Sequence, residues 1–393
     1  MDINVLLDQA MKSVNGQVIE WRRTLHQHPE VSFEEVWTSQ FIYDTLVSFG
    51  NLTVSRPTKT SVMARLIGTQ PGKVLALRAD IDALPVQEEN DLPYASQNPG
   101  VMHACGHDGH ASILLGAAKT LSQFKDSIKG EVRFIFQCAE EIPPGGACEM
   151  VKAGVMEGVD QVIALHLFSF ASVGQFAIGH GVVSSANDRF QIKIQGKGGH
   201  SSMPNVTIDP IAIGAQVVTN LQHIVSRQND PTEKLVISVT TFHGGDVFNV
   251  IPDSITMTGS VRSFNPELRK NVPILMERII KGVCEAHGAS YTFNYDTGYD
   301  MIINNEELTQ FVEETILEVW GPETLQKMEP MMGSEDFSAF ANVVPGCFVV
   351  VGVANEQKGI TYPQHHPRFD MDEDALAMGL ELFVQVAKKI TMA

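Results

Sequence analysis

Residues 131–146 read EVRFIFQCAEEIPPGG, a predicted strand that ends in charged and turn-forming residues. Its first half is mostly apolar, with β-branched and aromatic residues from Val132 to Phe136, which predicts a strand buried on both faces. The run ends in two adjacent carboxylates, Glu140 and Glu141, followed by turn-forming prolines and glycines. Taken alone, the pattern fits a strand that reaches solvent, because charged side chains are rarely buried. The rest of the chain decides whether the two glutamates have a further role.

Similar short apolar runs recur along the chain and alternate with stretches that have apolar residues at helical spacing. This alternation predicts an α/β fold with a mostly parallel central sheet flanked by helices. The expected strands are 74–77 (VLAL), 132–136, 162–165 (VIAL) and 347–353 (CFVVVGV). The expected helices include Val5 to Leu25, which should end before Pro29, and residues 103–124 and 307–319.

The pattern changes between residues 187 and 297. Three runs there, RFQIKIQG, SITMTGSVRSF and YTFNY, alternate apolar and polar residues, which predicts antiparallel strands with one exposed face. KLVISVTTF adds a fourth strand, and there are two helical stretches between them (209–227 and 266–288). The resulting order of strand, helix, strand, strand, helix, strand is the split βαβ, or ferredoxin-like, arrangement. We therefore predict an α+β domain at 187–297, inserted into an α/β domain formed by 1–186 and 298–393.

Composition excludes several classes of protein. With 46 acidic and 28 basic residues among 393, the formal net charge of −18 disfavours nucleic acid and anionic membranes as partners. No apolar stretch reaches the 18 or so residues of a membrane span, and the N-terminal residues have no signal-peptide pattern. The five cysteines are odd in number and widely spaced, unlike a secreted disulfide framework. These features predict a cytoplasmic protein.

Polar residues follow three of the predicted strands. In an open parallel sheet, ligands bind beyond the carboxyl ends of the strands, so these side chains should share one edge. They are Asp80 and Asp82 after the first strand, Glu140 and Glu141 after the second, and His166 after the third. A single metal site explains such a gathering better than several unrelated coincidences.

The helix at 103–124 begins with further candidate ligands, Cys105 and His107, at the same edge. A thiolate is favoured near the positive end of a helix dipole, which makes it a better metal ligand. Other residues of these types have ordinary explanations, as hydrogen-bonded core histidines or as packing cysteines. These are His103, His110, His180, Cys138 and Cys148.

The chain resembles the M20 family of metallopeptidases, specifically its amidohydrolase branch of N-acyl amino acid and hippurate hydrolases. The resemblance covers nearly the whole chain and rests on ten motifs in the family's order. They are RRTLHQHPEVSFEE, LRADIDALP, MHACGHDGHASILLGAA, QCAEEIPPGGA, ALHLF, GKGGHSSMP, NVIPD, GSVRSF, GSEDFS and HHPRFD. It implies a metal-binding catalytic domain of the zinc-peptidase type and an inserted lid or dimerisation domain.

The resemblance also implies a site for two divalent metal ions. Glu140 would act as general base on a metal-bound water and then as the acid that protonates the leaving amine. The family pattern selects His365 rather than His366 in HHPRFD. The implied protein ligands are Cys105, His107, Glu141, His166 and His365.

Metal identity stays open at this point. Most members of the family have a bridging aspartate, whereas this branch has a cysteine motif instead. A soft sulfur ligand favours zinc, while imidazole and carboxylate ligands also suit manganese, nickel or cobalt.

The inserted domain carries further residues to which the resemblance gives roles. His200 would reach the active site of a partner subunit in a homodimer or higher oligomer and stabilise the oxyanion; a surface-loop histidine is the alternative. Asn249 and Arg262 would contact substrate, and Arg262 suits a carboxylate. Gly333 would lie in a loop that approaches the substrate backbone.

The predicted function is metal-dependent hydrolysis of the amide bond of N-acyl amino acids or short peptides. A dipeptidase or carboxypeptidase of the same family is the closest alternative. A cysteine-nucleophile amidase using Cys105 would leave Glu141 and His365 without a role. A non-catalytic binding protein would be expected to lack Glu140.

Overall fold

The structure, a computed structural model, describes residues 2–392. It divides into two compact units. The first contains the described residues up to 183 together with 302–330 and those from 335 onward, and the second contains 184–301 and 331–334. The sequence prediction placed the inserted domain at 187–297, so segment 331–334, which it assigned to the larger domain, is a difference.

The first unit is built on a mixed sheet with the strand order β1-β2-β4-β3-β5-β16-β6-β15. Its four central strands are mutually parallel, as predicted: β4 (Lys129–Gln137), β3 (Gln70–Asp80), β5 (Gln161–Ser172) and β16 (Gly346–Ala354). The remaining strands are β1 (Thr53–Ser55), β2 (Val62–Ile67), β6 (Phe176–Ile178) and β15 (Leu325–Lys327). Two short strands, β7 (Gly181–Val182) and β14 (Ile303–Asn304), form a separate pair.

The carboxyl ends of the central strands meet at one edge. Asp80 is the last residue of β3 and lies opposite Gln137, the last residue of β4, so the two strands end together. His166 differs from the prediction that it would follow its strand. It lies inside β5, opposite Val350 of β16, because pairing with β16 continues to Phe168 and beyond.

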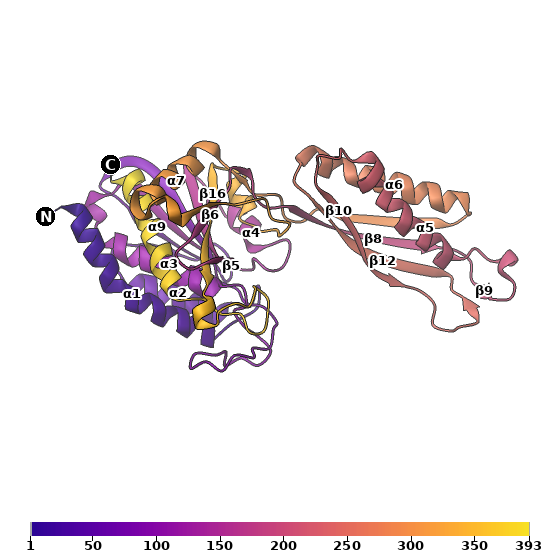
Figure 1. Cartoon of the computed structure of the whole chain (residues 1–393), viewed down its shortest axis with the longest axis horizontal. Helices are drawn as coiled ribbons and strands as arrows, with labels where there is room; N and C mark the ends of the chain where they lie inside the picture. Colours follow the sequence, from indigo (N-terminus) through magenta and orange to yellow (C-terminus); the bar gives the residue numbers. More distant parts are fainter. Residues whose placement is uncertain (1, 393) are drawn as a thin grey trace. The chain divides into compact units, whose positions relative to one another are not determined.

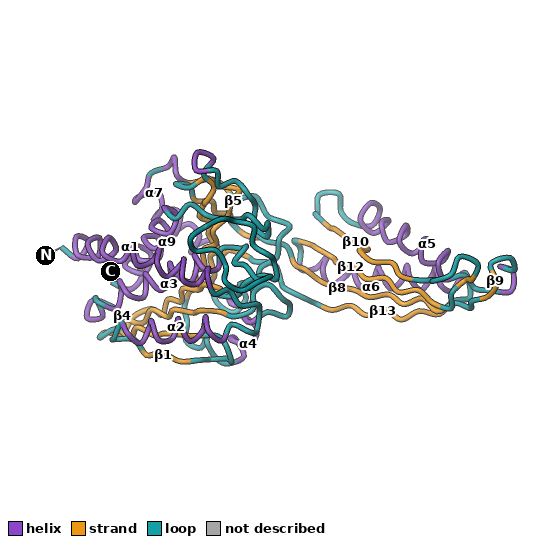
Figure 2. Tube along the Cα trace, turned by 90° about the horizontal axis from the view of Figure 1, so that it is seen from below, coloured by secondary structure: helices purple, strands orange, loops and turns teal. Residues whose placement is uncertain are grey.

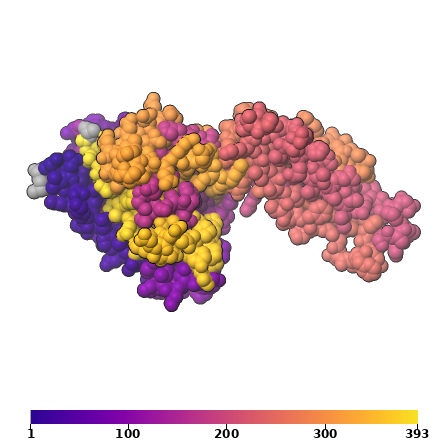
Figure 3. All heavy atoms as spheres, in the orientation of Figure 1, coloured from indigo at the N-terminus to yellow at the C-terminus, as the bar shows by residue number. Residues whose placement is uncertain are grey.

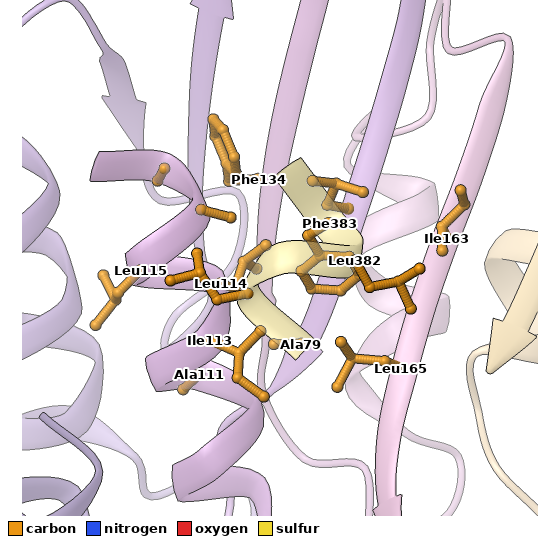
Figure 4. Packing of buried hydrophobic residues seen from close by; sticks show 14 of the residues in the cluster. Ala79, Ala111, Ile113, Leu114, Leu115, Phe134, Ile163, Leu165, Leu382 and Phe383 are labelled. Atoms are coloured by element: carbon orange, nitrogen blue, oxygen red, sulfur yellow. The ribbon is translucent and has the colours of Figure 1, made fainter. Parts of the chain in front are cut away.

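Helices α1 (Ile3–Gln27), α3 (His107–Ser122) and α9 (Asp374–Thr391) pack on one another, and α3 and α9 also contact β3 (Figure 2). Helices α1 and α9, far apart in the sequence, therefore lie side by side, indigo against yellow (Figure 3). Figure 4 shows apolar side chains of α3 and α9 meeting those of β3, β4 and β5 in the core. The other helices of this unit are α2 (Val36–Ser48), α4 (Gly146–Lys152), α7 (Glu306–Trp320) and α8 (Ser338–Ala341).

The second unit has a four-stranded antiparallel sheet in the order β10-β12-β8-β13, with α5 and α6 along one side (Figure 1). This is the predicted ferredoxin-like arrangement. Its elements are β8 (Ala186–Gln195), α5 (Pro210–His223), β10 (Leu235–His243), β12 (Ser254–Ser263), α6 (Pro266–Ala286) and β13 (Ser290–Asp296). A two-stranded ribbon, β9 (Gly199–His200) with β11 (Val250–Ile251), is part of the same unit. Among residues 2–392, no helix has the length and apolar character needed to span a bilayer.

Candidate metal centre

The start of α3 lies close to β5. Gly106 precedes the helix with φ +99°, a left-handed conformation that favours glycine. A Cβ on Gly109 would come within 2.5 Å of Leu167 Cδ1, so a larger residue there would push the helix away from the strand. This close approach places Cys105 Sγ 3.6 Å from His166 Nε2. The geometry thus joins residues that are 61 positions apart in the sequence.

Two histidines turn the Nε2 of their rings toward the other donor atoms at this edge. His107 Nδ1 lies 2.9 Å from the backbone carbonyl oxygen of Asp82, and His166 Nδ1 lies 3.0 Å from that of Leu167. A carbonyl oxygen only accepts, so each Nδ1 donates its hydrogen, and each neutral ring keeps a lone pair at Nε2. His107 Nε2 is buried without a hydrogen-bond partner. This is the arrangement of a histidine metal ligand with its tautomer fixed from behind.

His110 is different because both of its ring nitrogens are engaged. Its Nδ1 donates to Asp80 Oδ1 over 2.6 Å, and its Nε2 accepts from the backbone N–H of Leu167 over 2.9 Å. It therefore supports the backbone beside His166 and has no free lone pair, as expected for a hydrogen-bonded core histidine.

The other residues that were expected to be core histidines or packing cysteines fit that expectation only in part. His103 is buried but neither ring nitrogen has a hydrogen-bond partner, and burial lowers its pKa to about 4. His180 is on the surface rather than in the core, between Glu306 and Glu313. Cys138 is buried, whereas Cys148 is only partly so.

The loop after β16 brings His365 to the same place. Its backbone N–H donates to the carbonyl oxygen of Ala104 over 2.7 Å, and its Nε2 lies 3.3 Å from Glu141 Oε1. Glu141 Oε1 is buried, has no hydrogen-bond partner, and lies 4.0 Å from His107 Nε2. His366 points elsewhere, because its Nδ1 accepts from the backbone N–H of Arg368 and its ring stacks on Tyr362 at 4.4 Å.

All five ligands that the resemblance implied lie in two overlapping groups, within each of which the donor atoms are at most 4.8 Å apart. The first group is Cys105, His107 and His166, and the second is Cys105, Glu141 and His365. A thiol, three imidazoles and a carboxylate form a donor set that suits divalent cations of the zinc type. His107 Nε2 and Glu141 Oε1 are buried without a hydrogen bond among the described residues, and such cations would satisfy them. The residues present therefore fit bound metal.

The electrostatics of Cys105 correct one expectation. Its position before α3 was expected to favour the thiolate, but burial raises its pKa and Glu141 raises it further. Burial also lowers the pKa of His107, yet Asp80 and Cys105 outweigh this and raise it well above its ordinary value. The negative surroundings that favour a proton on His107 also favour a cation, whose binding releases protons from its ligands.

Glu140 lies beside the ligands in a second cluster of carboxylates with Glu335 and Asp336. Burial raises the pKa of Glu140 well above its ordinary range, and Glu335 and Glu141 add to the effect. Arg78 partly neutralises this charge. Its guanidinium donates to Glu335 over 2.8 Å and to Asp336 over 3.0 Å.

Arg78 also joins this cluster to the end of β3, because it donates to Asp80 over 2.7 Å. Neither the residue patterns nor the family resemblance assigned a role to Arg78, Glu335 or Asp336. A charge inside the buried strand VLALRAD was a usable signal, since a buried arginine requires several acceptors.

Asp80 and Asp82, expected at this edge, lie there and support the ligands. Asp82 Oδ2 accepts from the backbone N–H of Glu141 over 3.0 Å and from the hydroxyl of Ser32 over 2.7 Å. Its Oδ1 lies 3.2 Å from His107 Nδ1. These two aspartates thus fix the orientation of histidines and of the Glu141 backbone.

The other predicted site residues belong to the second unit. In the β9–β11 ribbon His200 pairs with Val250, and Ser201 N–H donates to the carbonyl oxygen of Asn249 over 3.1 Å. His200 is exposed, and its Nδ1 accepts from the backbone N–H of Ser202 over 3.1 Å. Because an N–H only donates, the neutral ring of His200 carries its hydrogen on Nε2.

Arg262 and Gly333 come together within the second unit. Arg262 donates to the carbonyl oxygen of Met332 over 2.8 Å, and the carbonyl oxygen of Gly333 accepts from Ser185 N–H over 3.0 Å. Burial lowers the pKa of Arg262, and no carboxylate counters this effect. A Cβ on Gly333 would meet nothing within 4 Å, so packing of the protein itself does not require glycine there.

Comparison with known proteins places these residues in context. The model of Peptidase family M20/M25/M40 matches residues 76–389. An N-acyl-L-amino acid amidohydrolase of Geobacillus stearothermophilus is 61% identical over 301 residues, which cover 77% of this chain and 81% of that protein. Thermostable carboxypeptidase 2 of Saccharolobus solfataricus is 41% identical over 382 residues and 96% of either chain.

A solved structure of the same family is also similar to this chain. The YXEP protein of Bacillus subtilis, described as a dinuclear metal-binding peptidase of the M20 family, superposes with a TM-score of 0.84 at 36% identity, covering 96% of this chain and 98% of that one. The resemblance drawn from the motifs is thereby confirmed. With a family model matched over most of its length and a relative of 61% identity, the chain belongs to peptidase family M20/M25/M40 and is a hydrolase.

Proposed function

We propose that this hydrolase cleaves the amide bond of N-acyl amino acids or short peptides, with two divalent cations held at the edge of the central sheet. The carrying observation is the pair of overlapping donor groups that share Cys105 and contain two buried atoms without partners. The relatives named as an amidohydrolase and as a metal-binding peptidase support the same reaction class.

Two bound cations would polarise the amide carbonyl and lower the pKa of water. Zinc suits the sulfur ligand, while manganese, nickel or cobalt would suit the imidazoles and carboxylate. The proposed ligands are Cys105, His107, Glu141, His166 and His365.

Glu140 would move the proton. It adjoins Glu141 in the chain and lies in one donor group with Glu141 and His107, yet it is also held among Glu335 and Asp336. Burial and these carboxylates raise its pKa, which suits a group that takes a proton from water and returns it to the leaving amine. Arg78 keeps the surrounding acidic cluster tolerable by binding Glu335 and Asp336.

The second unit would supply substrate contacts. The Nε2–H that the tautomer of His200 leaves free would donate to the developing oxyanion, from the partner subunit of a homodimer or higher oligomer. Arg262, partly buried without a carboxylate partner, would bind the free carboxylate of the substrate, and Asn249 would contact it as well. Gly333 would leave room for the substrate backbone. We place the enzyme in the cytoplasm.

A carboxypeptidase or dipeptidase is the second candidate, because a relative of 41% identity is named a carboxypeptidase. Both activities need a substrate with a free carboxylate, so Arg262 would serve either one. A cysteine nucleophile is disfavoured, since it would leave Glu141 and His365 without a role.

Metal analysis combined with a substrate panel tests the proposal. Purified enzyme should contain up to two equivalents of divalent metal, lose activity on chelation and regain it when metal is returned. N-acetyl and N-benzoyl amino acids should be hydrolysed faster than dipeptides of the same amino acids. Faster cleavage of dipeptides would favour the peptidase, and full activity after complete removal of metal would exclude both metal-dependent readings.

A further inference from the structure

The backbone around Glu140 is held by two buried carboxylates from distant parts of the chain. Glu35 Oε1 accepts the backbone N–H of Ala139 over 2.7 Å, and Asp82 Oδ2 accepts that of Glu141 over 3.0 Å. The residues on both sides of Glu140 are therefore fixed by hydrogen bonds that Glu140 itself does not make.

Ala139 has an unusual conformation for a residue with a side chain. Its φ is +51°, in the left-handed region, which is unfavourable for a residue with a side chain. The conformation is maintained at both ends of the residue, because its N–H binds Glu35 and its carbonyl oxygen accepts from Gly146 N–H over 2.9 Å. The turn at Ala139 sets the direction in which the chain continues to Glu140.

Glu35 should lower the stability of the fold, because it places a carboxyl group in the protein interior. Its side chain is buried with 0% exposure, and none of the described arginine, lysine or histidine residues forms an ion pair with it. Burial raises its pKa to about 7, and Asp82 adds to the effect. An apolar residue of similar size would fill the space without this penalty, but it could not accept the Ala139 N–H.

We propose that Glu35 is a positioning residue for the proposed base Glu140, acting through its hydrogen bond to the Ala139 amide. This inference rests on the proposed function of Glu140. Small misplacements of a reacting group are costly, about 10²-fold in rate for 1 Å. Loss of the Glu35 acceptor should therefore lower kcat about 10- to 100-fold and leave KM and metal content unchanged.

Three substitutions at Glu35 separate positioning from folding. Glu35→Ala and Glu35→Met both remove the acceptor, and methionine keeps most of the buried volume if alanine prevents folding. Glu35→Gln retains a side-chain oxygen that accepts the amide hydrogen and should keep most of the wild-type kcat. The neighbouring Glu34 is exposed and is the matched control, so Glu34→Ala should behave as wild type.

Amide hydrogen exchange over residues 138–141 gives a readout that does not depend on activity. Exchange should be faster in Glu35→Met than in wild type and nearly unchanged in Glu35→Gln. The inference is overturned if Glu35→Met keeps wild-type kcat, if Glu35→Gln is as impaired as Glu35→Met, or if exchange does not change. If the exchange difference appears but wild type cleaves no amide in the panel, the proposed function is wrong. The ordering of residues 138–141 by Glu35 would still be supported.

Discussion

His107 in the first unit and His200 in the second use the same ring in opposite ways. His107 Nδ1 donates to a carbonyl oxygen, which leaves a lone pair at Nε2 inside a buried cluster. His200 Nδ1 accepts from a backbone N–H, which leaves a hydrogen at Nε2 on an exposed ribbon. One hydrogen bond to the far nitrogen thus decides whether a histidine suits a cation or an anion.

The surroundings of His107 and His200 differ in burial and in the elements that support each ring. The first region is supported by side chains from several elements, such as Asp82, and it contains buried atoms that a cation would satisfy. The second is a short exposed ribbon whose His200 is bonded by residues close to it in the chain, next to a loop where Phe248 is 98% exposed. The first region therefore fits a bound cation, whereas the second presents a hydrogen-bond donor on an exposed ribbon.

The largest effect on kcat should come from substituting the adjacent residues Glu140 and Glu141 one at a time. Glu140→Gln should retain metal but lose roughly 10²- to 10⁴-fold in kcat, because it removes positioned proton transfer. Glu141→Gln should instead lose metal, since Glu141 Oε1 belongs to the donor group with Cys105 and His365. Metal content by elemental analysis and kcat on the best substrate check both variants. Equal metal content with full activity in both would end this assignment.

A smaller loss, about 10²- to 10³-fold in kcat, is expected for His200→Ala, which removes the proposed oxyanion donor. Metal content should not change, because His200 is outside both donor groups. His107→Ala should instead lower the metal content, so the two variants distinguish a proposed oxyanion donor from a proposed metal ligand.

Mixing subunits tests whether His200 serves a partner's site. If it does, a mixed dimer of His200→Ala and Glu140→Gln has one site with both defects and one with neither, so activity should recover toward half of wild type. Native mass measurement must first show that mixed dimers formed. No recovery in such dimers would mean that each subunit uses its own histidine.

Arg262→Ala should raise KM for substrates with a free carboxylate about 10- to 100-fold, the effect of losing a hydrogen bond to a charged group. Carboxamide analogues of the same substrates should be poor for wild type and little affected by the substitution. Arg262 and Arg189 both line one hollow on the sheet of the second unit. Arg189→Ala is therefore the matched control and should change KM little. An equal effect of Arg262→Ala on acids and carboxamides would remove the carboxylate role.

Much of the fold could be predicted from the sequence because the two sheets have different patterns. Fully apolar runs such as 347–353 indicated the parallel strands of the first unit, and alternation such as RFQIKIQG indicated the second. Two details escaped this reasoning. His166 lies inside β5 because the partner strand β16 extends the pairing, and segment 331–334 groups with the second unit through contacts such as that of Arg262 with Met332.

The candidate ligands could be named from their motifs, and Asp80 and Asp82 from their place after a strand, but the rest of the support could not be predicted. Arg78 and Glu35 act through contacts with residues far away in the chain, such as Glu335 and Ala139, which no local spacing reveals. For Cys105, a local rule about helix ends predicted a favoured thiolate, whereas burial of the side chain raises its pKa. Local chemistry therefore indicates which residues react, while tertiary contacts decide how their charges and tautomers are set.

The smallest expected effect concerns a third kind of histidine, His180, whose two ring nitrogens lie 2.9 Å from Glu306 and 3.0 Å from Glu313. Carboxylates only accept, so both nitrogens are favoured as N–H, and the pKa of His180 is raised, first by Glu313. Since the folded pKa exceeds the unfolded value of 6.5, the stabilisation is full below 6.5 and is lost as pH rises through the folded pKa.

His180→Gln should therefore destabilise the protein at pH 5.5 by no more than about 1 kcal/mol, because the site is partly exposed, and by less at pH 9. Urea unfolding of both proteins at the two pH values measures the difference. Metal content and kcat should not change, because His180 is outside the donor groups. A destabilisation that grows with pH would show that His180 is held neutral, and the rule that the partners of a ring set its charge would then fail at its simplest site.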